Sequence, residues 1–338
     1  MEGYAVTLIF ADGRSREIVA GRFETVEQAA RRHGIHLLTD CREGACGTCK
    51  AKCLRGEFFL NDYSREALSE DEAASGNVLT CQMQVRSPCI LEFDYAFAQT
   101  GAKSDETWLA SVASIDRVSE SVVRLVLRGE GEGGRSFLPG QYVNIAIPDK
   151  AAARSYSFAN EPGPRESIFF VRLIEGGVMG DYLLHRARPG DCLRLNGPFG
   201  RFFLRSEKRP LLMIAGGTGL APMLSILRHL ATRGEGPPRI LLIYGANRRA
   251  DLFGLDEIAQ LRAKLASLEA IVCVAEGDAE WKGPVGLVGN VAAQQEIDFA
   301  SFDVYLCGPP PMIEHVQTTL MPRGAKPERI FAERFLPT

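Results

Sequence analysis

The sequence predicts three successive domains: an α+β domain, then an antiparallel barrel or sandwich, then an α/β domain with an open parallel sheet. Three observations predict this order. A hairpin pattern and a helix come first; evenly spaced apolar runs with Pro-Gly turns follow; and after residue 209 apolar runs alternate with helical patterns. A length of 338 residues with 46% hydrophobic residues is enough for two or three cores.

The first segment is typical of a β-hairpin followed by a short helix. Apolar and polar residues alternate over residues 4–10, and Asp12-Gly13 is a hairpin turn signal. Thr25 and Gln28 form the pattern of a capping box, which predicts a helix that begins there and ends near Gly34.

Four cysteines form the most specific pattern in the chain. Three have C-x4-C-x2-C spacing and the fourth is distant: Cys41, Cys46, Cys49 and Cys81. This is the plant-type spacing for a [2Fe–2S] cluster, in which four thiolates surround two irons. Gly44 and Gly47 allow the loop to curl and to aim its N–H groups at the sulfur atoms. A zinc site would show two C-x2-C units, and only one is present.

Composition excludes several classes of function. A net charge of -3 gives no electrostatic basis for binding nucleic acid or an anionic membrane. No run approaches the ~20 apolar residues of a membrane span, and residues 1–4 do not begin a secretory signal. Nine cysteines, an odd number, then predict a reducing cytoplasm. Cys53 and Cys89 are interpreted as bystanders that pack like small hydrophobes.

The middle segment contains a motif suited to a phosphate and a flat ring, Arg154-Ser155-Tyr156-Ser157. An arginine on a strand offers a forked donor to a phosphate, and a tyrosine two residues later shares its side of the strand. The loop at 175–180 precedes an apparent helix at 181–184, whose first N–H groups suit a pyrophosphate. Alone, these features also fit an ordinary exposed strand and a plain loop. The predicted strands cover residues 122–127, 142–147, 168–174 and 192–195.

In the last segment, glycine-rich turns follow apolar strands. Residues 216–222 link the first strand to its helix, where glycines permit close approach of a dinucleotide phosphate and Pro222 suits a first helical turn. Pro222 replaces the third glycine of G-x-G-x-x-G. Residues 307–312 follow another strand, at the sheet edge where ligands bind. Predicted strands cover 211–215, 240–244, 270–275, 304–307 and 330–332, and predicted helices cover 221–232 and 255–268.

Together these stretches resemble the ferredoxin–NADP reductase superfamily, and their order resembles the reductase components of bacterial ring-hydroxylating dioxygenases, especially the benzoate and toluate 1,2-dioxygenase types. The resemblance implies a β-grasp [2Fe–2S] ferredoxin domain over 1–98, a six-stranded FAD-binding β-barrel over 107–206, and a five-stranded NAD(P)H-binding α/β domain over 207–338. The polar residues 99–106 predict a linker. A monomer that reduces a terminal oxygenase is expected.

The resemblance also implies roles for individual residues. Arg154 would hold a flavin phosphate, Tyr156 would pack on the isoalloxazine, and Ser157 would lie near flavin N5. Where the family usually carries Ser or Thr, this chain has Gly180, so a hydroxyl donor is missing while the helix N–H groups remain. Further contacts to the flavin and the nucleotide are expected from Ser155, Arg172, Gly177, Val178, Met179, Gly216, Gly217, Thr218, Gly219, Ala221, Pro222, Gly308, Pro309 and Met312.

At the nicotinamide, the resemblance implies that Cys307 lies beside the ring. Glu333 and Phe335 would complete the catalytic set with Ser157, the aromatic ring shielding the flavin until nicotinamide displaces it. NADH delivers two electrons and a [2Fe–2S] cluster accepts one, so the flavin belongs between them.

Two questions stay open at this stage. Arg248-Arg249 would suit the 2′-phosphate of NADPH. Residues 247–253, which include Asp251-Leu252-Phe253, look more like the NADH-using dioxygenase and monooxygenase reductases, which favours NADH. The rival functions are the reductase of a soluble di-iron monooxygenase of the phenol, toluene or methane type, with the same three modules, and a non-catalytic electron carrier.

Overall fold

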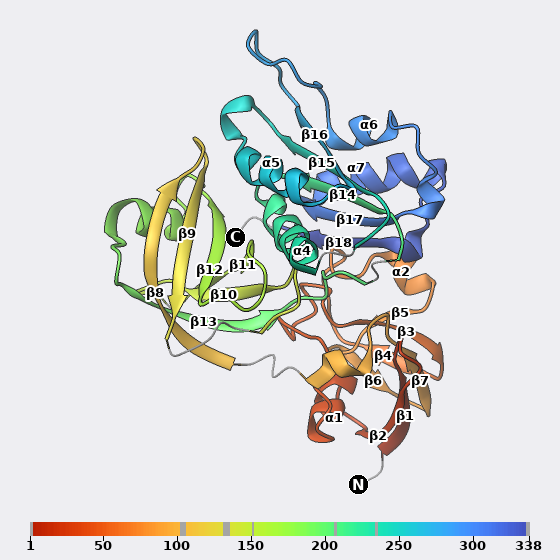
Figure 1. Cartoon of the computed structure of the whole chain (residues 1–338). Helices are drawn as coiled ribbons and strands as arrows, with labels where there is room; N and C mark the ends of the chain where they lie inside the picture. Colours follow the sequence, from red (N-terminus) through yellow and green to blue (C-terminus); the bar gives the residue numbers. More distant parts are fainter. Residues whose placement is uncertain are drawn as a thin grey trace. The chain divides into compact units, whose positions relative to one another are not determined.

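The computed structural model describes residues 3–101, 106–130, 136–150, 152–205, 208–233 and 236–335. The chain divides into two compact units. One comprises Met1–Glu106 with Gly197–Arg201, and the other comprises Thr107–Asn196 with Phe202–Thr338. Figure 1 colours the chain from red at its start to blue at its end.

The first unit has a five-stranded sheet with the order β2-β1-β7-β3-β5. Its strands are β1 (Gly3–Ile9), β2 (Ser15–Gly21), β3 (Lys50–Arg55), β5 (Asn77–Leu79) and β7 (Cys89–Glu92). β1 pairs antiparallel with β2 through the predicted turn and parallel with the distant β7. β4 (Phe58–Leu60) and β6 (Met83–Val85) form a separate pair. This mixed sheet confirms the expected β-grasp domain.

The first helix, α1 (Val26–Arg32), forms where the capping box predicts it. The Gln28 N–H donates to Thr25 Oγ1 at 3.3 Å, and the Thr25 N–H donates to Gln28 Oε1 at 3.0 Å. Gly34, with φ 74°, directly follows the C-cap residue His33. α1 buries several side chains in the core, whereas α2 (Glu70–Ala74), which Ser69 caps in the same way, buries none.

Of the predicted linker 99–106, residues 102–105 lie outside the described residues. On either side of them are η1 (Phe97–Gly101) and the first residue of β8 (Glu106–Arg117). The predicted limit between residues 206 and 207 also lies outside the described ranges. The domain limits 1–98, 107–206 and 207–338 therefore stay predictions.

In the second unit, six strands form one sheet with the order β11-β10-β13-β8-β9-β12. Besides β8, they are β9 (Val122–Gly129), β10 (Tyr142–Ala146), β11 (Ala153–Ser157), β12 (Glu166–Arg172) and β13 (Cys192–Phe199). β10 with β11, β8 with β9, and β9 with β12 are antiparallel. The two edge strands, β11 and β12, contact each other, so the sheet curls around a core that contains Leu125, Ile145 and Phe169. The six-stranded antiparallel barrel is confirmed.

The same unit contains a five-stranded parallel sheet with the order β16-β15-β14-β17-β18. Its strands are β14 (Leu211–Gly216), β15 (Ile240–Ala246), β16 (Leu268–Val274), β17 (Asp303–Gly308) and β18 (Ile330–Arg334). α4 (Leu220–Arg233) and α5 (Leu255–Lys264) cover one face, and α6 (Val288–Ala293) and α7 (Pro310–Leu320) cover the other (Figure 1). The strand order reverses between β14 and β17, so a ligand crevice is expected at their carboxyl ends.

The predicted helix at 255–268 is too long. α5 ends at Lys264, and Leu268 instead begins β16, where it pairs with Ile240 of β15. Pairing with a buried neighbouring strand thus overrides the helical pattern of its sequence.

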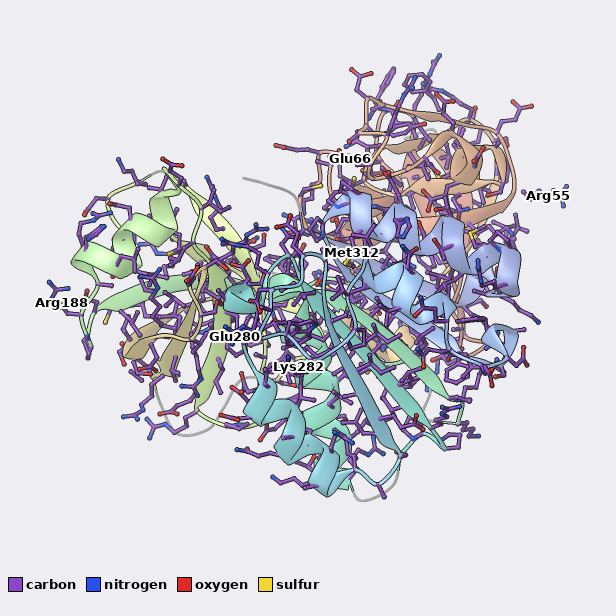
Figure 2. The ribbon with its side chains drawn as sticks, turned by 90° about the horizontal axis from the view of Figure 1, so that it is seen from above. Arg55, Glu66, Arg188, Glu280, Lys282 and Met312 are labelled. Carbon is purple, nitrogen blue, oxygen red and sulfur yellow. The ribbon has the colours of Figure 1, made fainter. Side chains whose placement is uncertain are left out.

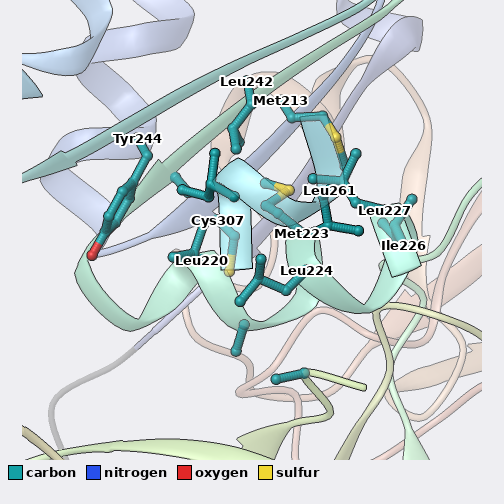
Figure 3. Packing of buried hydrophobic residues seen from close by; sticks show 14 of the residues in the cluster. Met213, Leu220, Met223, Leu224, Ile226, Leu227, Leu242, Tyr244, Leu261 and Cys307 are labelled. Carbon is teal, nitrogen blue, oxygen red and sulfur yellow. The ribbon is translucent and has the colours of Figure 1, made fainter. Parts of the chain in front are cut away.

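A shared core holds the barrel and the parallel sheet together. In Figure 3, Met213, Leu242 and Tyr244 of the sheet pack among apolar residues of α4, and Cys307 lies in the same cluster. The barrel residues Val122, Ala159, Phe170 and Phe202 belong to this cluster too. The barrel's side chains are therefore held in place against the nucleotide sheet.

Shorter helical turns complete the second unit. They are α3 (Val178–Asp181), the π-helix η2 (Tyr182–Arg186), and η3 (Gly217–Gly219), η4 (Arg249–Asp251), η5 (Phe299–Ser301), η6 (Met321–Arg323) and η7 (Pro327–Arg329). Among the helices of the described ranges, none has the length and apolar composition that a bilayer crossing requires.

We predict that Thr25→Ala destabilises α1 by about 1 kcal/mol, because the capping hydrogen bond from the Gln28 N–H to Thr25 Oγ1 is lost. Amide hydrogen exchange across α1 should then be roughly fivefold faster, measured by mass spectrometry. Ser69→Ala is the matched control: the equivalent cap is lost from a helix that buries no side chain, so exchange in α2 should change less. Equal effects on the two helices would contradict the prediction.

Candidate functional site

The cysteine loop turns tightly through residues with left-handed backbone conformations. Gly44 and Gly47 have φ of 75° and 72°, and Arg42 has φ 59°. A Cβ on Gly44 would lie 2.8 Å from the Cβ of Tyr63. The curl expected from the two glycines is therefore present, whereas the left-handed Arg42 was not anticipated.

The four predicted ligand cysteines lie in two thiol pairs. Cys49 Sγ lies 3.2 Å from Cys81 Sγ, and the Cys41 and Cys46 thiols are hydrogen-bonded to each other. Within the described ranges, no three His, Cys or acidic side chains are grouped so that they could hold one metal ion. Two thiol pairs match the two irons of a [2Fe–2S] cluster better than they match a single zinc ion.

Backbone N–H groups around the loop donate to these sulfur atoms. The Ala45 N–H lies 3.3 Å from Cys41 Sγ, and the Thr48 N–H lies 3.5 Å from Cys46 Sγ. The Cys46 thiol and several loop N–H groups outweigh burial and lower the pKa of Cys41 to about 5. Donors that stabilise negative sulfur are what a thiolate-bound cluster needs, so these residues fit one.

One member of this donor set was missed at the sequence level. Gln82 Nε2 lies 3.6 Å from Cys81 Sγ and donates to the Arg42 carbonyl oxygen at 3.1 Å. The Cys49 thiol, with smaller contributions from the Gly44 N–H and Gln82, lowers the pKa of Cys81. A polar residue directly after the anchor cysteine was the only available signal.

Cys53 and Cys89 lie apart from this set. Each sulfur lies within hydrogen-bond distance of a backbone carbonyl oxygen, Cys53 Sγ 3.4 Å from that of Arg55 and Cys89 Sγ 3.3 Å from that of Ser87. The two thiols are hydrogen-bonded to each other. This arrangement supports their interpretation as bystanders.

In the barrel, β11 positions the Arg-x-Tyr-Ser motif on an edge strand. Arg154 and Tyr156 lie opposite Ile145 and Val143, so both lie on the same side of the strand; Ile145 and Val143 belong to the barrel core. Tyr156 packs against that core, and burial raises its pKa. Ser155 lies on the other side, where its hydroxyl donates to Asn144 Oδ1 at 2.6 Å.

The predicted helix at 181–184 begins three residues earlier than expected. Gly176, with φ 71°, makes the turn, Gly177 is the N-cap, and α3 begins at Val178. Met179 and Gly180 thus contribute N–H groups to the first helical turn. A Cβ on Gly180 would lie 3.4 Å from Leu173 Cδ2, an ordinary contact, so packing does not force a glycine here. Arg172 is exposed at the end of β12.

At the edge of the parallel sheet, the turns after β14 and β17 pack closely together. A Cβ on Gly219 would lie 2.1 Å from the Cys307 carbonyl oxygen, and one on Gly216 would lie 2.4 Å from Met312 Sδ. Gly217 has φ 54°. Pro222 is in the first turn of α4, as predicted. The glycines therefore allow the two strand ends to pack closely, a contact that the sequence did not reveal. The two turns lie at the carboxyl edge of the sheet, where the crevice is expected. The other expected nucleotide contacts here are Thr218, Ala221, Gly308 and Pro309.

Three of the four predicted catalytic residues meet at one carboxylate. Glu333 Oε2 accepts from Ser157 Oγ at 3.2 Å and lies 3.9 Å from Cys307 Sγ. Ser157 ends the barrel strand β11, while Cys307 and Glu333 lie opposite each other on β17 and β18. Burial, then the Glu333 carboxylate, raises the pKa of Cys307 well above its usual value. The thiol thus stays neutral beside the carboxylate.

Phe335, the fourth predicted residue, lies close to this group. Its N–H donates to the Gly308 carbonyl oxygen at 2.9 Å, and its ring packs against the shared core. The end of the described chain is thereby held at the carboxyl edge of β17.

Three protein families match successive parts of the chain. Residues 9–86 match the "2Fe-2S iron-sulfur cluster binding domain", residues 109–204 the "Oxidoreductase FAD-binding domain", and residues 213–318 the "Oxidoreductase NAD-binding domain". These matches establish a 2Fe-2S cluster, FAD and NAD(H) as the cofactors.

Curated relatives extend over nearly the whole chain. The 2-halobenzoate 1,2-dioxygenase electron transfer component of Burkholderia cepacia is 38% identical over 99% of this chain and 98% of its own length. The toluate 1,2-dioxygenase component of Pseudomonas putida is 38% identical over 98% of both chains. The propane 2-monooxygenase reductase component of a Gordonia strain is 35% identical over 94% of both.

Among solved structures, an Amycolatopsis cytochrome P450 reductase superimposes with a TM-score of 0.72 and 28% identity, covering 99% of each chain. The same three modules thus occur together in reductases that serve different oxygenases. The chain therefore belongs to the family of oxygenase electron transfer components, the iron–sulfur flavoprotein reductases that combine a 2Fe-2S domain with FAD-binding and NAD-binding oxidoreductase domains.

Proposed function

We propose that this oxidoreductase takes hydride from NADH and delivers electrons through FAD and its 2Fe-2S cluster to the terminal oxygenase of an aromatic-ring dioxygenase. The convergence of Ser157, Cys307 and Glu333 carries the proposal, because it joins the barrel to the nucleotide crevice. The 38% identity to two dioxygenase electron transfer components supports the choice of partner.

The side chains around Glu333 have complementary tasks in this proposal. Bound FAD supplies the chemistry that accepts two electrons together and releases them singly. Ser157, hydrogen-bonded to Glu333, positions a hydroxyl where the barrel meets the sheet. Cys307 contributes a neutral thiol, which adds no second negative charge beside the carboxylate. The residues thus orient the reactants and exclude water; no acid–base triad is required.

Further contacts belong to the same proposal. Arg154 and Tyr156 would bind the flavin phosphate and ring, the first turn of α3 would bind the flavin pyrophosphate, and the turns after β14 and β17 would bind the nicotinamide nucleotide. Cys41, Cys46, Cys49 and Cys81 would hold the cluster. Thiols that must remain reduced to bind iron support a cytoplasmic location.

A second candidate function is supported by the propane 2-monooxygenase reductase, which is 35% identical. Such a reductase has the same three modules, and the oxygenase partner performs the substrate chemistry. Reconstitution with each kind of purified oxygenase, followed by product formation, distinguishes the two partners.

Anaerobic titration with NADH tests the proposed path. Bleaching of the flavin followed by the low-temperature EPR signal of a reduced cluster is expected. Bleaching without that signal would contradict the cluster assignment or the transfer to it. A response to NADPH alone would reverse the choice of nucleotide.

We predict that Cys46→Ser abolishes the cluster EPR signal while NADH still bleaches the flavin, because one thiolate ligand is lost. Cys53→Ser should retain the signal, since that thiol lies outside the two ligand pairs. Loss of the signal in both variants would contradict the assignment of ligands.

We predict that Cys307→Ala slows flavin reduction by NADH at least about tenfold, because the nicotinamide loses a neighbour that positions it. Cys273→Ala is the matched control, since Cys273 is equally buried in the same sheet, on β16. Stopped-flow absorbance measures both rates. Similar slowing in the control would indicate a packing effect instead.

We predict that Gly180→Ser strengthens FAD binding about tenfold, because a hydroxyl that donates to a charged phosphate contributes about 1.5 kcal/mol. Gly180→Ala adds the same Cβ without the hydroxyl, and should leave affinity closer to that of the parent chain. Fluorescence titration of the flavin-free protein measures both. Equal gains would mean that helix propensity, not the hydroxyl, is responsible.

A further inference from the structure

The loops after β15 and β16 lie side by side at the carboxyl edge of the parallel sheet. The Ala275 N–H donates to the Ala246 carbonyl oxygen at 3.0 Å, and the Glu276 N–H donates to that of Asn247 at 2.8 Å. These bonds continue the pairing of the two strands beyond their ends. Residues 276–280 are thereby held beside the segment that contains Arg248 and Arg249.

Two carboxylates from the second loop bind Arg249. Its Nε donates to Asp278 Oδ2 at 3.2 Å, and its Nη2 donates to Glu280 Oε2. Asp278 is itself fixed, because its Oδ1 accepts from the N–H groups of Glu280 and Trp281, both at 2.9 Å. Figure 2 labels Glu280 and Lys282 on this loop. Arg249 is therefore held by a preorganised pair of acids.

Arg248 is similarly engaged. Its Nε lies 3.3 Å from Asp251 Oδ2, and its Nη2 lies 3.8 Å from Glu120 Oε2. Asp251 also accepts from the Ser121 hydroxyl at 2.7 Å. Four carboxylates thus surround the two guanidinium groups, and the excess of charge at this edge is negative.

We propose that Asp278 and Glu280 form an acidic clamp on Arg249 that makes the nucleotide site reject the 2′-phosphate of NADPH. The end of the second strand is where such a site meets the adenosine ribose, and where an arginine accommodates the 2′-phosphate. The Arg249 side chain is 47% exposed, so a ligand can reach it. A 2′-phosphate would have to displace two carboxylates from Arg249 and would lie among other negative charges. A 2′-hydroxyl is uncharged, so the carboxylates do not repel it. This inference rests on the proposed function, since it assigns the nucleotide preference of the same site.

The double variant Asp278→Asn/Glu280→Gln tests the clamp. The amide introduced by Asp278→Asn still presents a carbonyl oxygen to the two backbone N–H groups, so the loop keeps its hydrogen bonds while both charges are lost. The ratio of kcat/KM for NADPH to that for NADH should rise about tenfold, equivalent to ~1.4 kcal/mol. Direct titration with 2′,5′-ADP and with 5′-AMP should show the same change in relative affinity.

Two further variants identify the cause. Glu269→Gln breaks the exposed pair that Arg239 Nε and Nη2 form with Glu269, at 3.1 Å each, near the opposite ends of β15 and β16, and should leave the ratio unchanged. Adding Arg249→Ala to the double variant should remove most of the gain, because the released guanidinium group is the proposed partner of the 2′-phosphate. A gain of the same size without Arg249 would overturn the proposal, because another cation, such as Lys282 on the same loop, would then be responsible.

An unchanged ratio and unchanged 2′,5′-ADP affinity in the double variant would also overturn the proposal, as would a parent chain that uses both nucleotides equally. Failure of the proposed function looks different: neither nucleotide would bleach the flavin of the parent chain. The nucleotide titrations still report on the clamp in that case, since they need no turnover.

Discussion

The functional half of this molecule depends on one shared hydrogen-bond acceptor, the Glu333 carboxylate. Ser157 reaches it from the barrel, and Cys307 reaches it from the neighbouring strand of the parallel sheet. Both partners are buried, so the hydrogen bonds act where water does not compete. The apolar cluster common to barrel and sheet keeps these elements from moving apart. The strand proposed to bind the flavin and the crevice proposed to bind the nucleotide are thereby brought together.

The cysteine loop is built to stabilise negative charge on its sulfur atoms. Its left-handed residues turn N–H groups toward thiols that are already paired, Cys41 with Cys46 and Cys49 with Cys81. Fixed backbone N–H dipoles thus stabilise negative charge on the sulfur atoms, as they stabilise bound anions at turns in other proteins. At the carboxyl edge of the parallel sheet, carboxylates instead neutralise the charges of Arg248 and Arg249. The proposed preference for NADH then comes from repulsion of the 2′-phosphate of NADPH.

The motifs that predict the candidate site lie in short stretches of the sequence. The cysteine spacing, the Arg154 to Ser157 motif and the glycine turn after β14 each lie within a few residues, and local spacing is what a sequence displays directly. The start of α3 at Val178 was predicted wrongly, because a turn at Gly176 placed the N-cap earlier than the apolar pattern indicated. Gln82 and the acids that hold Arg249 were missed, since Gln82 also binds the carbonyl oxygen of Arg42, 40 residues away, and Arg249 is held by acids from another loop.

The sequence by itself determined the three modules, their order and the ligand types, because periodicity, turn residues and cysteine spacing are local properties. Tertiary structure alone decided which distant groups meet: β1 with β7, Gly219 with the Cys307 carbonyl, and Ser157 with Glu333, which is 176 residues away. It also ended α5 at Lys264, because Leu268 was needed to pair with β15. Such contacts depend on the strand order of the sheets, which no local pattern encodes.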